Sequence, residues 1–156
     1  MNYEILHWDS DFFGIKIAKI SEFANKNQFN SVLNQLKDEG IQLVYCFTTP
    51  ENIEANQTYY EFGQLVDKKV TYYQKIKKKQ YILDKNIELY NLNSVTPELL
   101  ELALQSGEFS RFKVDPKFPK GSFEKLYTKW IENSVNKKFD DAVYVYIIEN
   151  SIKGLL

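Results

Sequence analysis

The sequence has few of the residues on which catalytic and metal sites are most often built. It holds one histidine, His7, one cysteine, Cys46, and one arginine, Arg111. A single cysteine cannot form an internal disulfide, and one histidine with one cysteine would need carboxylates from scattered positions to hold zinc. His7 lies in an apolar segment typical of a strand, and Cys46 lies inside an apolar run, which favours a buried, inert thiol. We therefore expect no metal site and assign no catalytic residue.

Closely spaced glycines and long apolar runs are also missing. The six glycines lie at positions 14, 40, 63, 107, 121 and 154, with no two adjacent or two apart, which excludes a glycine-rich phosphate loop. No apolar stretch approaches the ~18 residues of a membrane-spanning helix, and Met1–Glu4 lacks the basic start of a signal peptide. The net charge is −1, so electrostatics does not favour nucleic acid or anionic membranes. We expect a cytoplasmic protein that binds neither.

Aromatic residues are the abundant feature, at 15% of the chain. Rings bury more area than other side chains, so a ring-rich core is favoured over a surface that stacks on sugars or bases. The same preference applies to Trp8, Phe12 and Phe13. A basic run at Lys77–Lys79 favours a solvated edge or linker over a phosphate contact.

The first half of the chain alternates strand and helix patterns. The helix prediction is clearest where Phe29, Val32, Leu33 and Leu36 form one apolar stripe before Gly40. The run Ile41–Thr48 reads as a buried strand, parallel to a neighbour because a helix precedes it. The other predicted elements are strands over Tyr3–Trp8, Ile15–Ile20 and Leu65–Ile76, a turn at Asp9–Asp11, and a helix that starts at Thr49-Pro50-Glu51 and ends at Gly63.

A boundary near Gln80 separates two predicted domains, an N-terminal α/β unit over 1–79 and a second unit over 80–156. The second unit reads as strand–helix–loop–helix–strand–strand: Ile87–Leu92, Thr96 to Gly107, Ser110–Lys120, a helix capped by Ser122, then Asp141–Glu149 and Ile152–Leu156 around a turn at Asn150-Ser151. These patterns predict an α/β protein in the broad sense, an α+β arrangement of helices packed against a mixed sheet.

Arg111 is the residue of most chemical interest, because every other basic side chain is lysine. Its planar guanidinium can bind a phosphate or carboxylate through two parallel hydrogen bonds. A structural arginine that pairs with Asp115 or binds backbone carbonyls is slightly favoured over the ligand contact. The residue types leave both interpretations open.

Three stretches resemble one branch of a known family. They are Trp8–Gly14, Tyr59–Asp67, and Ser110-Arg111-Phe112 with Asp115-Pro116, Phe118-Pro119, Leu126-Tyr127 and Trp130-Ile131. In this order they resemble the GNAT superfamily of N-acetyltransferases, in the branch of the TDP-fucosamine (TDP-4-amino-4,6-dideoxygalactose) acetyltransferases. The resemblance implies an N-terminal α/β unit followed by the N-terminal half of a GNAT fold.

The resemblance also implies a reaction. The amine of a nucleotide-linked amino sugar would attack the thioester of acetyl-CoA, with a base to deprotonate the amine and an acid to protonate the leaving thiolate. Backbone donors would stabilise the oxyanion. GNAT acceptor sites use the connection between the first two helices, so Arg111 and Phe112 are the expected substrate-binding residues, Arg111 on the phosphate and Phe112 along the acceptor cleft.

The sequence departs from the family at the cofactor. It has no Arg/Gln-x-x-Gly-x-Gly/Ala loop for the pyrophosphate of acetyl-CoA, so no catalytic or cofactor-binding residue is carried over. The resemblance thus predicts a truncated, inactive acetyltransferase. The alternative is a non-catalytic binding module that holds a nucleotide sugar or a protein partner. An exposed strand edge near Leu156 predicts a homo-oligomer.

Overall fold

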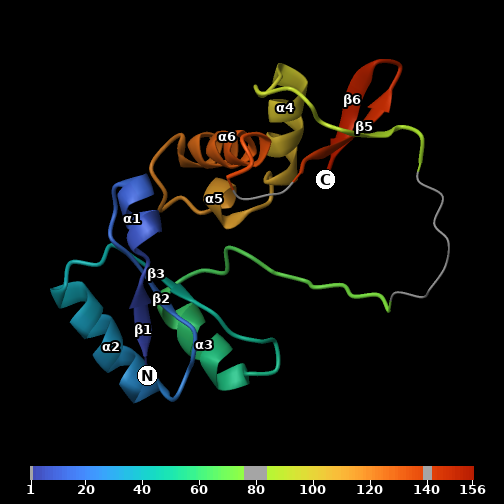
Figure 1. Cartoon of the computed structure of the whole chain (residues 1–156). Coiled ribbons are helices and arrows are strands. Elements are labelled where there is room, and N and C mark those ends of the chain that lie inside the picture. The colour runs from blue at the N-terminus through green and yellow to red at the C-terminus, as the bar shows by residue number, and fades with distance from the viewer. Residues whose placement is uncertain (1, 76–83, 139–141) are drawn as a thin grey trace. The chain divides into compact units, whose positions relative to one another are not determined.

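The computed structural model describes residues 2–75, 84–138 and 142–156. The chain divides into two compact units, Met1–Val66 and Asp67–Leu156, each with its own sheet and helices (Figure 1). Helices and strands mix in both units, which confirms the predicted α/β class of the α+β kind. The predicted domain boundary near Gln80 lies outside the described residues.

The first unit is built on a three-stranded sheet in the order β1-β2-β3. Strands β1 (Tyr3–Ile5) and β2 (Ile17–Ile20) are antiparallel, and β2 and β3 (Leu43–Cys46) are parallel. A parallel pair needs a crossover connection, which helix α2 (Lys26–Asp38) supplies. The predicted strand around Ile41–Thr48 and its parallel pairing are therefore confirmed.

One face of this sheet holds the core of the first unit. Ala18 and Ile20 of β2 pack against Phe29 and Leu36 of α2, and all four side chains are buried. Tyr59 of helix α3 (Ile53–Phe62) packs against the same cluster. The apolar stripe of α2 thus faces the sheet as predicted, and Gly40 follows the helix with φ +75°.

The segment after β1 was predicted wrongly as a continuing strand and a turn. Helix α1 (His7–Phe13) occupies it and places His7 at an exposed helical position. Ser10 explains the difference: its hydroxyl donates to the Leu6 carbonyl at 2.7 Å and accepts from the Ile17 backbone N–H at 3.0 Å. These two bonds link the N-cap residue of α1 to the first residue of β2 through one side chain, and Gly14, at φ +72°, ends the helix.

Two further expectations for this half are corrected. Helix α3 begins at Ile53 instead of Thr49-Pro50-Glu51, because the Asn52 side chain accepts from the Ala55 N–H at 3.1 Å and caps it there. Residues 65–75 form no strand with any described residue, although their sequence alternates. Tyr72 and Tyr73 are more than 90% exposed. A segment with alternating apolar residues forms a strand only where a neighbouring strand pairs with it and a core covers its apolar face.

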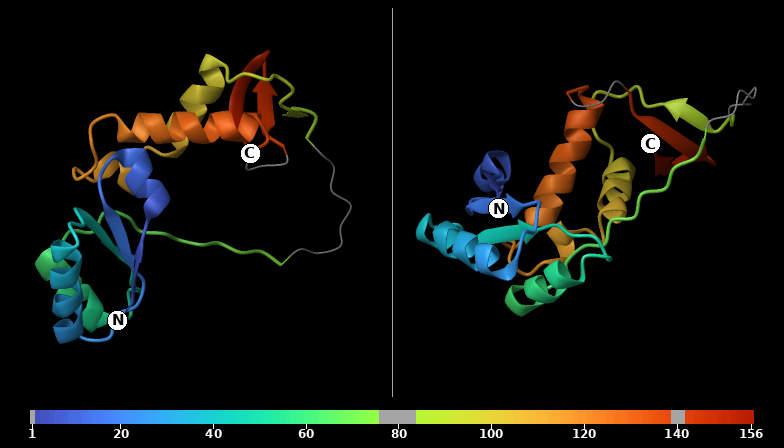
Figure 2. Two further views of the ribbon diagram at one scale, coloured as in Figure 1. Left: turned by 60° about the vertical axis from the view of Figure 1, so that its left-hand side comes forward. Right: turned by 90° about the horizontal axis from the view of Figure 1, so that it is seen from below.

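The second unit is an antiparallel sheet in the order β4-β5-β6 with helices on one face (Figure 2). The elements are β4 (Ile87–Leu89), α4 (Pro97–Ser106), α5 (Arg111–Val114), α6 (Ser122–Val135), β5 (Tyr144–Ile148) and β6 (Ser151–Leu155). Leu99 and Ala103 of α4 pack against Ile131 of α6 and Val145 of β5. The order and type of these elements match the prediction, and Thr96 caps α4 by accepting from the Leu99 N–H.

Details of the second unit differ from the prediction. The loop 110–120 contains the short helix α5, and Gly121, with φ +83°, occupies the N-cap position of α6 in place of Ser122. The hairpin turn is formed by Glu149 and Asn150 instead of Asn150 and Ser151. Both turn residues have positive φ, at 49° and 61°, which is the backbone that a two-residue hairpin of matching twist requires.

Candidate ligand site beside Arg111

The turn from α4 into α5 positions Arg111 at the first residue of a short helix. Gly107 ends α4 and its carbonyl accepts from the Ser110 N–H at 2.9 Å, which closes the turn. The Arg111 carbonyl accepts from the Asp115 N–H at 2.9 Å. Backbone hydrogen bonds on both sides of Arg111 therefore fix the position of its Cα, from which the side chain extends.

The end of α5 is closed by Asp115, which is 95% buried. One oxygen of its carboxylate accepts from the Lys117 N–H at 2.9 Å, and its carbonyl accepts from the Phe118 N–H at 3.3 Å. This local turn, with Pro116 inside it, directs the chain so that Phe118 folds back onto Phe112.

Five aromatic rings lie in one continuous series around α5 and α6, which we call the ring series. Phe118 contacts Phe112 with ring centroids 5.3 Å apart, and Phe112 contacts Trp130 at 5.9 Å with the planes at 89°. Trp130 contacts Tyr127 at 5.1 Å, and Tyr127 contacts Phe123 at 4.8 Å. Edge-to-face and tilted contacts of this kind are favourable beyond the area they bury, so the rings hold one another in place.

Two cationic side chains lie on this series. The Arg111 guanidinium carbon is 4.5 Å from the centroid of Phe112, and the Lys113 ammonium nitrogen is 4.6 Å from the centroid of Phe123. Lys113 also forms an ion pair with Glu124 at 3.3 Å. Hydrogen bonds from the backbone N–H of Glu124 and then from Lys113 hold the pKa of the Glu124 carboxyl below its ordinary value.

The two predicted site residues are neighbours on α5, and the Arg111 guanidinium lies over the ring of Phe112. The sequence pattern does not predict that Phe112 also contacts Trp130, because the two residues lie on different helices, α5 and α6. The available signal was the stripe of Phe123, Tyr127 and Trp130 on α6, which predicts a shared face but not the partner that this face receives.

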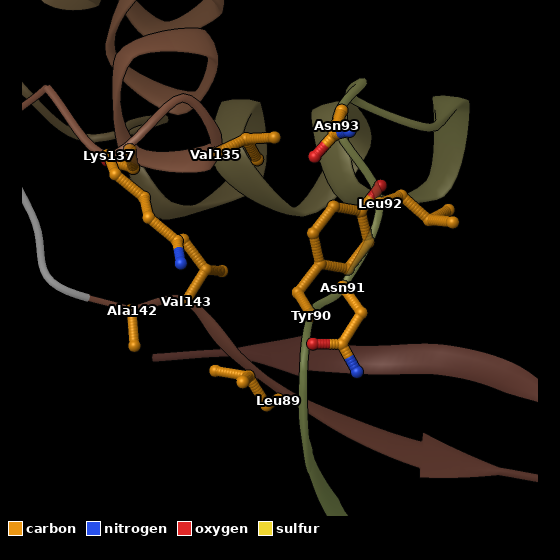
Figure 3. Close-up of a pocket in the computed structure, with 10 residues that line it drawn as sticks. Leu89, Tyr90, Asn91, Leu92, Asn93, Val135, Lys137, Ala142 and Val143 are labelled. Atoms are coloured by element: carbon orange, nitrogen blue, oxygen red, sulfur yellow. The ribbon is translucent and has the colours of Figure 1, made fainter.

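A small cavity of about 100 Å³ lies elsewhere in the second unit (Figure 3). It is lined by the end of β4, the end of α6 and the start of β5, including Tyr90, Asn91, Ser134, Lys137 and Val143. Neither Arg111 nor Phe112 lines it. Sites for ligands larger than a few atoms usually measure about 300–1,000 Å³, so this cavity is too small for a nucleotide sugar.

Cys46 lies at the end of β3 and is partly buried. Burial raises the pKa of its thiol from an ordinary 9.0 to about 12, and burial likewise raises the pKa of Tyr59 to about 12. At neutral pH the thiol is protonated and cannot act as a nucleophile. The structure thus supports the inert thiol expected from the sequence.

This difference in pKa predicts a slow reaction of Cys46 with thiol reagents. At pH 8 the thiolate fraction should fall about a thousandfold between the unfolded and folded chains, because the pKa differs by about three units. We expect reaction with a chromogenic disulfide to be at least a hundredfold faster in 8 M urea than in buffer. Equal rates in the two conditions would show that the thiol is not protected by the fold.

Comparison with protein-family models finds no match to this chain, and comparison with curated proteins finds none. Across residues 2–75, 84–138 and 142–156, no group of three or more histidine, cysteine, aspartate or glutamate side chains is placed to hold a metal ion. None of the helices in those ranges has both the length and the apolar character needed to cross a bilayer.

Proposed function

We propose that this chain is the acceptor-binding part of an N-acetyltransferase that acts on the amine of a nucleotide-linked amino sugar. The observation that carries the proposal is the element order β4-α4-α5-α6-β5-β6 with three antiparallel strands. It matches the order that the resemblance to the N-terminal half of GNAT acetyltransferases implies. Fold analogy alone does not assign a function, so the site must carry the chemistry.

Arg111 supplies the expected contact with the nucleotide diphosphate. The guanidinium carbon lies 4.5 Å from the centroid of the Phe112 ring, and the N–H donors of an arginine lie in the plane of its guanidinium group. A planar donor fork of this kind suits two oxygens of one phosphate. Stacking on Phe112 restricts the side chain before the ligand arrives, which lowers the entropy lost on binding.

Acetyl-CoA would supply the acetyl group in such an enzyme, but the residues of this chain do not fit its pyrophosphate. A phosphate cradle needs neighbouring glycines with positive φ, whereas Gly14, Gly40 and Gly121 adopt positive φ singly and far apart. The proposal is therefore limited to binding of the acceptor. No catalytic or cofactor-binding residue is assigned.

The Arg111→Ala variant should bind TDP-4-amino-4,6-dideoxygalactose roughly tenfold to a hundredfold more weakly than the unaltered chain, because a hydrogen bond to a charged group contributes about 1.5–3 kcal/mol. Isothermal titration calorimetry measures the effect. Arg111→Lys should recover only part of the affinity, since lysine keeps the charge and loses the fork.

Lys113→Ala is the matched control, because Lys113 lies on the same helix and is paired with Glu124. It should change affinity less than threefold. Equal affinity in Arg111→Ala and the unaltered chain would refute the phosphate contact.

The predicted self-association through the last strand stays a prediction. Within the described residues, β6 pairs with β5 on one side only. Its register is irregular opposite Tyr146 and Ile147, and Lys153 lies at that irregularity. Bulges and lysines on edge strands hinder the addition of a further strand, so these features weaken the case for an oligomer formed at this edge.

A further inference from the structure

We propose that Trp130 forms the ring-stacking side of the ligand site beside Arg111 and takes the hexose ring of the nucleotide sugar. This inference rests on the proposed function, because it assumes that Arg111 contacts the diphosphate. It adds a residue from α6 to a site that the sequence placed only on the connection between α4 and α6.

Exposure within the ring series points to Trp130. The two ends of the series are buried, with Phe118 at 9% and Phe123 at 6% exposed, whereas Trp130 in the middle is 36% exposed. Large rings in a packed cluster are normally covered, and a partly open tryptophan keeps area available for a ligand. The ring series is therefore exposed to solvent at Trp130, the ring that contacts Phe112.

The position of Trp130 is set by contacts on two sides. Phe112 meets it at 89° and Tyr127 at 60°, with centroids 5.9 and 5.1 Å away. Tyr127 belongs to α6, which the core of the second unit holds through Ile131, and Phe112 belongs to α5, which backbone hydrogen bonds close at both ends. A ring fixed in this way loses little freedom when a ligand stacks on it.

The order of contacts selects the hexose over the base. Arg111 lies on Phe112 and Phe112 lies against Trp130, so one phenyl ring separates the guanidinium from the tryptophan. In a nucleoside diphosphate sugar the hexose is joined to the diphosphate through a single oxygen, whereas the base is joined through a ribose. A phosphate on Arg111 thus brings the hexose, with its C–H face, nearest to Trp130.

The test compares TDP-4-amino-4,6-dideoxygalactose with TDP alone, titrated by calorimetry into the full chain and into Trp130→Leu. We expect the sugar nucleotide to bind the unaltered chain roughly tenfold more tightly than TDP, because covering the tryptophan ring with the C–H face of the sugar removes about 50 Å² of apolar surface from water at ~25 cal/mol per Å². In Trp130→Leu that ratio should fall to within twofold of one while affinity for TDP is unchanged. Trp130→Tyr should restore most of the ratio, and Trp8→Leu, at the other tryptophan, should leave it intact.

The outcomes separate the two proposals. Equal weakening of TDP and the sugar nucleotide in Trp130→Leu would mean that the ring contacts the nucleotide, which overturns the hexose assignment. No weakening of either ligand would remove Trp130 from the site. In both cases an effect of Arg111→Ala would leave the proposed function intact. A ratio that is lost in Trp130→Leu cannot come from partial unfolding, because unfolding reduces the binding of both ligands alike.

Discussion

Phe29→Ala should destabilise the first unit by about 3–5 kcal/mol, the usual cost of removing a buried phenyl ring. Phe29 is 2% exposed and its ring lies 5.1 Å from Tyr59 and 5.6 Å from Phe62, so it joins α2 to α3 above the sheet. The loss comes from the transfer of the ring out of the core and from the cavity it leaves. A unit of this size has a stability of only about 5–15 kcal/mol, so the variant should lie close to unfolding.

The two tryptophans allow each unit to be followed separately, because Trp8 lies in the first unit and Trp130 in the second. In a Trp130→Phe background, urea unfolding monitored by Trp8 fluorescence reports on the first unit. Phe47→Ala is the matched control, since Phe47 is 47% exposed and its truncation should cost less than about 1 kcal/mol. Similar midpoints for Phe29→Ala and Phe47→Ala would contradict the core described for this unit.

Gly107→Ala should destabilise the second unit by about 1–3 kcal/mol or more, as expected for an overpacked contact. A methyl group at this position would fall within the van der Waals radii of the Tyr127 ring. The backbone is not the cause, because φ at Gly107 is −102° and alanine adopts that angle freely. The glycine is therefore needed for the close approach of the end of α4 to α6, which also sets the ring series.

A double-mutant cycle identifies the cause. Tyr127→Leu removes the ring, so Gly107→Ala should cost much less in that background than in the unaltered chain. Gly154→Ala is the matched control within the same unit, since an added methyl there would meet only the Tyr146 Cβ at 3.4 Å, an ordinary van der Waals contact. With Trp130 as the reporter in a Trp8→Phe background, additive effects of the 107 and 127 substitutions would refute the steric contact.

The helices with a complete apolar stripe were predictable because periodicity measures the face that must be buried. The stripes of α2 and α6, and the Thr96-Pro97 start of α4, identified three helices whose ends lie near the expected residues. The parallel strand β3 followed from the helix before it. In these elements local propensity and burial agree, so the pattern was sufficient.

The failures occurred where a side chain bonds to the backbone or where a partner strand is required. Nothing in the apolar pattern of Tyr3–Trp8 indicates that the Ser10 hydroxyl bonds to Leu6 and Ile17, yet those bonds place a helix there. The alternation over 65–75 predicted a strand, and no described strand pairs with it. Patterns record which residues suit a strand, but pairing is a long-range event that they do not contain.

The candidate site, too, was predicted from the sequence in part, and the rest was visible only in the structure. Arg111 stands out from composition, because it is the one arginine among lysines, whereas Phe112 was predicted only from the resemblance to GNAT acceptor sites. That the Arg111 guanidinium lies over the Phe112 ring, and that Phe112 on α5 contacts Trp130 on α6, required the folded chain. Class of fold, helix stripes and the candidate arginine are properties of short segments, whereas ring contacts depend on how α5 and α6 close on each other around Gly107 and Tyr127, and such closure is decided only when the whole core packs.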